Sequence, residues 1–163
     1  MQYTSHYRSP IGDLTLAADE QGLTGLWFDG QKYFGSTLTP LHQDKPLPLF
    51  EEVEHWLDLY FDGKQPKGVP PLHLEGTPFR LSVWQLLLEI PYGELRTYKQ
   101  LAEELARRQG LRTMSAQAIG GAVGHNPISL IVPCHRIVGS DGSLTGYAGG
   151  MERKEWLLRM ERK

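Results

Sequence analysis

The sequence predicts a two-domain α/β protein of the α+β type, with a sheet-containing N-terminal domain and a mainly helical C-terminal domain. Short apolar runs alternate with turn residues along the first third of the chain, which is typical of antiparallel strands. Along the second half, apolar residues instead recur at helical spacing. The proline-rich stretch 66–71 separates the two patterns, so we place a supporting domain at 1–76 and a second domain at 77–163.

The predicted N-terminal strands are delimited by tight turns. Apolar runs and turn signals alternate along residues 5–7, 10–12, 14–18, 19–22 and 23–28. Glycines and prolines recur through residues 30–48, which predicts a loop or an irregular connection. Apolar residues from Phe50 to Phe61 then follow helical spacing, and Asp62 with Gly63 ends that predicted helix.

Four helices are predicted in the C-terminal domain. They are an apolar stripe over 79–88 stopped by 91–93, a helix over 98–106, a helix over 114–123 and a last helix that carries 156–158. Thr97 and Gln100 form a capping-box pattern that opens the second helix. The third helix consists of unusually small residues, and two helices joined by a turn indicate a helix-turn-helix. Small residues also let a helix pack closely on its neighbour, which is the stronger explanation from that helix alone.

The composition is that of an ordinary globular protein, with 40% hydrophobic and 22% charged residues among 163. The sequence shows no signal-peptide pattern and no apolar run long enough to span a bilayer, so we expect a cytoplasmic protein. The net charge of −2 hides an asymmetry. Residues 1–76 carry 5 Lys and Arg against 11 Asp and Glu, whereas residues 77–163 carry 12 against 8. The basic second half suggests contact with nucleic acid, although surface charge is more often only solvated.

Cys134 is the only cysteine, and it lies between Pro133 and His135 at the centre of an apolar run. A lone thiol cannot form an internal disulfide, which suits a reducing compartment. A thiol is a strong nucleophile only when it is ionised, so a nearby base must take its proton. Because neighbours in a strand point to opposite faces, His135 needs a turn or a bridging water to act. Pro133 makes irregular backbone plausible there, and the alternative is that Cys134 is a small buried hydrophobe.

No metal site is predicted. One cysteine cannot supply a thiolate cluster, and the six histidines are scattered along the chain. These histidines are His6, His42, His55, His73, His125 and His135.

The residues around Cys134 resemble the signature of a known family. The similar segments are 76–79, Thr97 with Tyr98, 124–128, 133–138, 142–150, and 154–158 with Glu161. Together they are similar to the O6-alkylguanine-DNA alkyltransferases. The resemblance covers the whole second half, is highly specific, and implies a winged helix-turn-helix domain there. The first half resembles the family's small ribonuclease-H-like domain more loosely.

The resemblance implies direct DNA repair without a cofactor. Proteins of this family bind duplex DNA in the minor groove, flip the alkylated guanine out of the helix and move its alkyl group irreversibly to the cysteine. The transferred group comes from the lesion itself, so no cofactor is needed. Each molecule would act once, because the thioether formed on Cys134 has no leaving route. The expected partner is duplex DNA that contains O6-alkylguanine, bound by a monomer with no membrane contact. Acceptance of O4-alkylthymine stays open.

The resemblance also assigns catalytic roles. Cys134 would be the alkyl acceptor, His135 would take its proton through a water, and Glu161 would orient the imidazole. Tyr98 would donate to the guanine ring as charge builds there, and Asn126 would brace the site by hydrogen bonds. Without the resemblance, Glu161 is read as a surface charge near the C-terminus. Tyr98 is then a half-buried aromatic residue, and Asn126 belongs to an ordinary Asn-Pro turn.

Substrate-binding residues follow from the same resemblance. Backbone groups of Cys134, Ile137 and Ala148 would read the edge of the guanine. Tyr147 would line the pocket that receives the alkyl group, and we place Gly146 in the same substrate-binding segment.

Predicted DNA contacts lie mostly on the helix-turn-helix. They are Thr97, Arg112, Ser115, Ala116, Gln117 and Arg136. Gln117 stands where many family members place an arginine finger that fills the gap left by the flipped base. Glutamine is shorter and uncharged, although its amide can hydrogen-bond to an orphaned cytosine, so we expect weaker binding. The segment before it also looks long, and Arg107 and Arg108 are either compensating phosphate contacts or solvated charges.

Three rival functions come from other classes. The alkyltransferase-like proteins recognise the lesion without repairing it, but they replace the cysteine, usually with tryptophan, so Cys134 argues against that role. A hydrolase or transferase built on a Cys-His-Glu site would show catalytic turnover. A helix-turn-helix regulator would bind a preferred sequence and tolerate Cys134→Ser.

Overall fold

A computed structural model describes residues 1–163 and divides the chain into two compact units. The first unit comprises Met1–Glu75 and Pro127–Ile131, and the second comprises Gly76–Asn126 and Val132–Lys163. The composition and patterning of the sequence predicted a single boundary before Thr77. The predicted boundary assigns Pro127–Ile131 to the second domain, whereas in the structure this segment belongs to the first unit.

The late segment joins the first unit through backbone hydrogen bonds. Leu26 N–H donates to the carbonyl of Pro127 at 2.9 Å, and Ser129 N–H donates to the carbonyl of Leu26 at 2.9 Å. Ile128 is fully buried there. A short apolar segment with no turn pattern of its own carries no sequence signal that shows which unit it will join.

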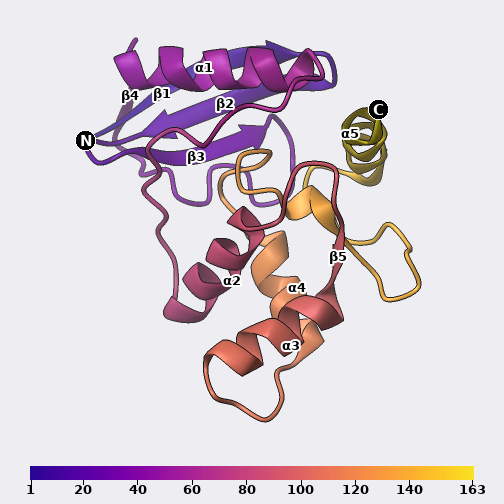
Figure 1. The fold of residues 1–163 in the computed structure, drawn as a ribbon. Coiled ribbons are helices and arrows are strands. Elements are labelled where there is room, and N and C mark those ends of the chain that lie inside the picture. Colours follow the sequence, from indigo (N-terminus) through magenta and orange to yellow (C-terminus); the bar gives the residue numbers. More distant parts are fainter. The chain divides into compact units, whose positions relative to one another are not determined.

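A four-stranded sheet forms the body of the first unit, with strand order β3-β2-β1-β4 (Figure 1). The strands are β1 (Gln2–Ser9), β2 (Gly12–Ala18), β3 (Leu23–Phe28) and β4 (His42–Asp44). The first three are antiparallel and joined by tight turns, as the alternating pattern predicted.

Strand β4 falls inside the stretch for which a loop was predicted. It pairs parallel with β1, with His42 opposite Gln2 and Asp44 opposite Thr4. The Thr4 hydroxyl also donates to the Asp44 carboxylate. All three residues of β4 are exposed, so the strand has no apolar alternation by which a sequence could reveal it.

Helix α1 (Pro48–Phe61) lies along the sheet of the first unit (Figure 1). Pro48 occupies the first turn, where its missing N–H costs nothing. The buried residues of the helix recur at three- and four-residue spacing and are Phe50, Val53, Leu57 and Tyr60. Gly63 ends the helix with φ +77°, so the predicted stop at this position is confirmed.

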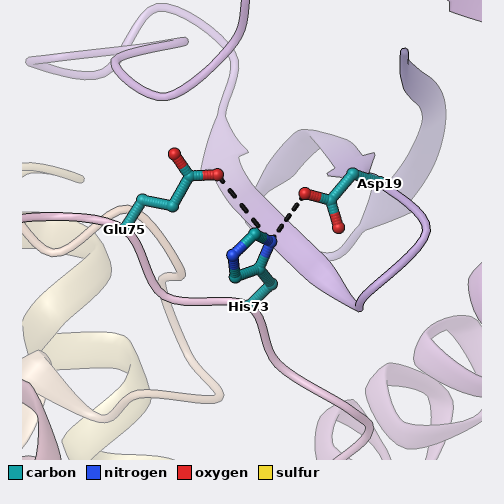
Figure 2. Close-up of side chains that lie close together, drawn as sticks. All are labelled: Asp19, His73 and Glu75. Carbon is teal, nitrogen blue, oxygen red and sulfur yellow. Dashed lines mark hydrogen bonds and ion pairs between the residues drawn. The ribbon is translucent and has the colours of Figure 1, made fainter.

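An ion pair fastens the end of the first unit to the turn between β2 and β3. His73 Nδ1 lies 2.6 Å from an Asp19 carboxylate oxygen, and Glu75 lies 3.8 Å from the same nitrogen (Figure 2). The other Asp19 oxygen accepts from the backbone N–H groups of Gln21 and Gly22. His73 is thus grouped with two carboxylates, a cluster that the scattered sequence positions did not predict. The hydrogen bonds of Asp19 indicate that this cluster has a structural role, and we call the Asp19–His73 pair the clip.

Asp19→Ala is expected to lower the free energy of unfolding by about 1–3 kcal/mol, because it removes charge-assisted hydrogen bonds at a mostly buried carboxylate. Burial opposes ionisation of Asp19, but hydrogen bonds from Gln21, His73 and Gly22 hold its pKa below the usual value. Its contribution is therefore present above about pH 4 and lost as the pH falls through the lowered pKa. Urea unfolding across that range measures the difference.

The matched control for this clip is Glu75→Gln. The Glu75 side chain is 53% exposed and sits at the longer distance, so its neutralisation should leave the unfolding free energy within about 0.5 kcal/mol of wild type. Equal losses for the two variants would contradict the clip.

The second unit is mainly helical (Figure 1). Two short strands also pair in parallel within it. Its elements are α2 (Pro78–Leu88), β5 (Arg96–Thr97), α3 (Tyr98–Arg108), α4 (Ala116–Gly124), β6 (Ile137–Val138) and α5 (Met151–Arg162). The capping box of Thr97 and Gln100 opens α3 as predicted. Helix α4 begins two residues later than predicted, because Ser115 is its N-cap. The Ser115 side chain accepts a hydrogen bond from the backbone N–H of Ala118. No helix of the chain is long and apolar enough to cross a membrane.

The small residues of α4 allow close packing inside the second unit. The Trp84 indole on α2 donates to the Ala122 carbonyl at 2.8 Å. A Cβ placed on Gly120 would lie 3.7 Å from the Tyr98 ring. The close-packing explanation therefore holds for this face, while Ser115, Ala116 and Gln117 at the start of the helix are exposed.

Candidate active site around Cys134

Cys134 opens a single 3-10 turn, Cys134–Arg136, that leads directly into β6. Cys134 N–H donates to the carbonyl of Val132 at 2.8 Å, and Arg136 N–H donates to that of Pro133 at 3.0 Å. A 3-10 turn rotates successive side chains by about a third of a circle, unlike the alternation of a strand. The backbone is thus irregular at the proline, which meets the condition set by the sequence for His135 to assist Cys134.

The thiol of Cys134 is nearly buried, with 6% of the residue exposed. Burial raises its pKa, while a hydrogen bond from Asn126 and the positive charge of Lys154 act in the opposite direction. Asn126 is itself buried, and its Nδ2 donates to the Val132 carbonyl at 2.8 Å, next to the reactive turn. The site therefore holds a protonated thiol that needs a base before it can react.

His135 and Glu161 form a buried pair. Their closest atoms, Nε2 and Oε2, lie 2.7 Å apart, and both side chains are at most 1% exposed. Burial lowers the pKa of His135 although Glu161 opposes that shift. Burial also works against the Glu161 carboxylate, but hydrogen bonds from His135 and Arg136 hold its pKa far below the usual value. A neutral imidazole that donates Nε2–H to the carboxylate carries its lone pair on Nδ1, where it can accept a proton.

Arg136 does not fit its predicted role as a DNA contact. Its Nε donates to Glu161 at 2.8 Å, and its Nη1 donates to the carbonyl of Ile90 at 2.8 Å. Its guanidinium also lies 5.6 Å from the centroid of the Tyr92 ring. The side chain is only 10% exposed, so its charge serves Glu161 in the interior and is not presented to a phosphate. This correction follows from the burial of Arg136, which the sequence around it does not reveal.

Tyr98 begins α3 and is held against the loop that precedes α5. Its hydroxyl donates to the Thr145 carbonyl at 3.1 Å, and burial raises its pKa. Gly146 adopts φ +61°, and a Cβ on it would lie 3.4 Å from the Tyr98 hydroxyl. Both the backbone conformation and this contact favour glycine there. The phenol is therefore a neutral donor with a fixed position.

The predicted substrate-binding residues lie in β6 and in the loop before α5. Ile137 is fully buried at the start of β6, and Ala148 is partly exposed. The Tyr147 ring packs edge-on against His135, with centroids 6.4 Å apart. The exposed Gly146 precedes it. Of these residues, Ile137 directly follows the reactive turn and Tyr147 contacts it through His135.

The predicted DNA contacts differ in how available their charges are. Arg107 and Arg108 both pair with Glu104, and Arg108 also pairs with Glu89 at 2.6 Å. Their charges are partly compensated within the protein. Arg112 is exposed and makes no ion pair, so it remains the available cation of this segment. Thr97 and Ser115 use their side chains to cap α3 and α4.

Lys154 is a buried residue of this region to which the sequence analysis assigned no role. It is fully buried on α5, where its Nζ donates to the carbonyls of Ile137 and Thr145. A signal for it exists in the sequence. The buried residues of α5 recur at helical spacing and are Lys154, Leu157, Leu158 and Glu161. Two charged residues at positions of a core-facing stripe indicate buried charge with a specific role.

Two family domains match the chain. The domain described as "6-O-methylguanine DNA methyltransferase, ribonuclease-like domain" matches residues 2–69. The domain described as "6-O-methylguanine DNA methyltransferase, DNA binding domain" matches residues 78–163.

Relatives match nearly the whole length. The methylated-DNA–protein-cysteine methyltransferase of Haemophilus influenzae is 41% identical over 161 residues, which cover 98% of this chain and 86% of that protein. The protein of the same name from Methanosarcina barkeri is 43% identical over 160 residues, with 98% and 96% covered. The crystal structure of Mycobacterium tuberculosis OGT in complex with DNA has a TM-score of 0.83 and 40% identity, with 99% of this chain and 92% of that chain covered.

Proposed function

Because this chain belongs to the 6-O-methylguanine DNA methyltransferase family, we propose that it repairs DNA by moving the alkyl group of O6-alkylguanine irreversibly to its own Cys134. The observation that carries this proposal is the reactive turn, in which the one cysteine of the chain stands next to the buried pair of His135 and Glu161. Nucleophile, base and orienting carboxylate are then supplied by a single unit.

The reaction balances without a cofactor. The Cys134 proton passes through a water to Nδ1 of His135, and Glu161 stabilises the imidazolium that forms. The thiolate attacks the alkyl carbon, so an S–C bond forms while the C–O6 bond of the lesion breaks. The electron pair of the C–O6 bond stays on the guanine, which takes up one proton on its ring through the Tyr98 hydroxyl as charge builds. The proton held by His135 is returned through water, so His135 and Tyr98 end neutral. The product thioether has no leaving route, which makes the protein a single-turnover transferase.

Substrate recognition uses the segment that follows the reactive turn. Backbone groups of Cys134, Ile137 and Ala148 read the edge of the flipped guanine, and Tyr147 lines the space for the alkyl group. Gly146 permits the tight approach of this segment to Tyr98. The guanine reaches these groups only after it leaves the base stack. Its extrusion costs about a few kcal/mol, and the cost is least for a poorly paired lesion.

Duplex DNA is bound through the helix-turn-helix in the minor groove, by a monomer. The exposed start of α4 presents Ser115, Ala116 and Gln117, and Thr97 opens α3. Arg112 supplies a phosphate contact. Gln117 takes the place of the flipped base and hydrogen-bonds to the orphaned cytosine.

Gln117→Arg is expected to tighten binding to lesion-containing duplex by about three- to tenfold and to add about one charge to the salt dependence. Position 117 is exposed in the first turn of α4, so the longer cation fits without repacking. Fluorescence anisotropy at several salt concentrations measures both effects. Gln117→Ala is the matched variant and should weaken binding with an unchanged salt slope. An unchanged affinity in both variants would place the gap-filling residue elsewhere.

The stoichiometry of repair tests the proposed function against its rivals. With a large excess of duplex that carries O6-methylguanine, the restored guanine should reach a plateau at one per protein molecule. A hydrolase would continue beyond that plateau, and a recognition protein would bind the lesion and restore none. Duplex with O4-methylthymine, run in parallel, measures whether the pyrimidine lesion is accepted.

A further inference from the structure

A lysine with no carboxylate partner lies at the centre of the second unit. Lys154 is 0% exposed, and its Nζ donates to the carbonyl of Ile137 and, at 2.9 Å, to the carbonyl of Thr145. Taking an ammonium group out of water costs several kcal/mol unless charge or hydrogen bonds compensate. Two carbonyl dipoles offset only part of that cost, so a purely structural role would be met as well by an apolar side chain.

The two carbonyls belong to the segment that surrounds the reactive cysteine. Ile137 directly follows the reactive turn, and Thr145 precedes the pocket residues. The Thr145 carbonyl also accepts from the Tyr98 hydroxyl at 3.1 Å. Lys154 therefore fixes both ends of the segment 137–145 and the acceptor that positions the phenol.

The titratable groups that feel the charge of Lys154 are those of the reaction. Burial raises the pKa of the Cys134 thiol, and the positive charge of Lys154 opposes that shift after the hydrogen bond from Asn126. Burial is the main cause of the lowered pKa of His135, and the charge of Lys154 adds to that lowering. Burial lowers the pKa of Lys154 itself to about 8, so the ammonium form predominates at neutral pH. Among the charged neighbours, Glu161 is engaged by His135 and Arg136. The attraction between Lys154 and Cys134 is mutual, because the charge of an ionised Cys134 opposes the lowering of the Lys154 pKa.

We propose that Lys154 is a positioning residue for alkyl transfer, which holds the carbonyls of Ile137 and Thr145 in place and acts as the countercharge of the Cys134 thiolate. The proposal rests on the proposed function for its link to alkyl transfer. The effect of Lys154 on the ionisation of Cys134 does not depend on alkyl transfer, so it can be measured without DNA.

Three substitutions separate the two parts of this role. Lys154→Met keeps the length of the side chain and removes both charge and donors. Lys154→Gln keeps a donor for a carbonyl and removes the charge, while Lys154→Arg keeps the charge. Arg159→Met is the matched control, because it removes an exposed cation from the same helix.

The first readout is the rate of Cys134 alkylation by iodoacetamide against pH, in the absence of DNA. The midpoint should rise by about one unit or more in Lys154→Met and Lys154→Gln, which is about a tenfold slower reaction at neutral pH. Lys154→Arg should restore most of the wild-type profile, and Arg159→Met should match wild type. Since Lys154→Gln retains a carbonyl donor, it keeps this test open if Lys154→Met does not fold.

The second readout is the single-turnover rate of alkyl transfer alongside the affinity for lesion-containing duplex. Lys154→Gln should slow transfer by about tenfold or more and change affinity by less than about threefold. A folded Lys154→Gln with the wild-type thiol profile would overturn the proposal. If wild type transfers no alkyl group, the proposed function fails, and the thiol profile still decides the electrostatic role of Lys154.

Discussion

Cys134→Ser is expected to lower the rate of alkyl transfer by about 10⁵-fold or more, while binding to lesion-containing duplex stays within about threefold of wild type. The two side chains are close in size, so the fold should tolerate the change although the site is nearly buried. A hydroxyl is far less acidic than a thiol, and the neutral imidazole of His135 cannot ionise it to a useful extent. Single-turnover kinetics and anisotropy measure the two quantities on the same duplex.

Transfer by Cys134→Ser at a rate near wild type would move the acceptor away from position 134. Such a result would also favour the helix-turn-helix regulator, which needs no thiol. The matched variant Ser143→Ala changes one hydroxyl in the exposed loop after β6 and should leave transfer within about twofold of wild type.

Glu161→Gln has the second largest expected effect, because one carboxylate serves two buried partners. The variant should transfer alkyl groups about 10³- to 10⁴-fold more slowly, since the amide no longer fixes the tautomer of His135 or stabilises its cation. The guanidinium of Arg136 also loses its countercharge, which should lower the free energy of unfolding by about 3–5 kcal/mol. Single-turnover kinetics and urea unfolding separate the two losses.

The pH dependence of stability provides a further check on Glu161. Its pKa in the folded protein lies below the ordinary value because hydrogen bonds from His135 and Arg136 outweigh the effect of burial. Its contribution is present above the unfolded value of about 4.3 and is lost as the pH falls through the lowered pKa. Wild type and Glu161→Gln should therefore differ most near neutral pH and converge in acid. Glu155→Gln, at an exposed position on α5, should follow wild type throughout.

Elements with a local sequence signal were predicted well. The antiparallel strands 14–18 and 23–28 correspond to β2 and β3 within one or two residues, because turn residues bound them. The capping box at Thr97 marked the start of α3, since that pattern satisfies backbone donors at a helix start. Apolar spacing alone likewise located α1 and α2.

Features that depend on tertiary contacts could not be predicted from the sequence. Strand β4 is fully exposed and pairs with a distant strand, so no apolar pattern marks it. The burial of Arg136 depends on Glu161, which lies 25 residues away in the chain. The role of Lys154 depends on carbonyls from β6 and from the loop before α5, and backbone groups carry no residue-specific signal. The resemblance supplied most of the candidate site residues. The helical spacing of Lys154 and Glu161 indicates buried charge, while the groups that these charges contact required the structure.

The most direct test of the account is the intact mass of the protein after incubation with excess duplex that carries a single O6-methylguanine, followed by peptide mapping. We expect a gain of one methyl group per molecule, located on the peptide that contains Cys134, with no gain in Cys134→Ala. A protein that binds this duplex tightly and keeps its original mass would contradict alkyl transfer and identify a lesion-recognition protein. A methyl group found on another peptide would contradict the assignment of Cys134.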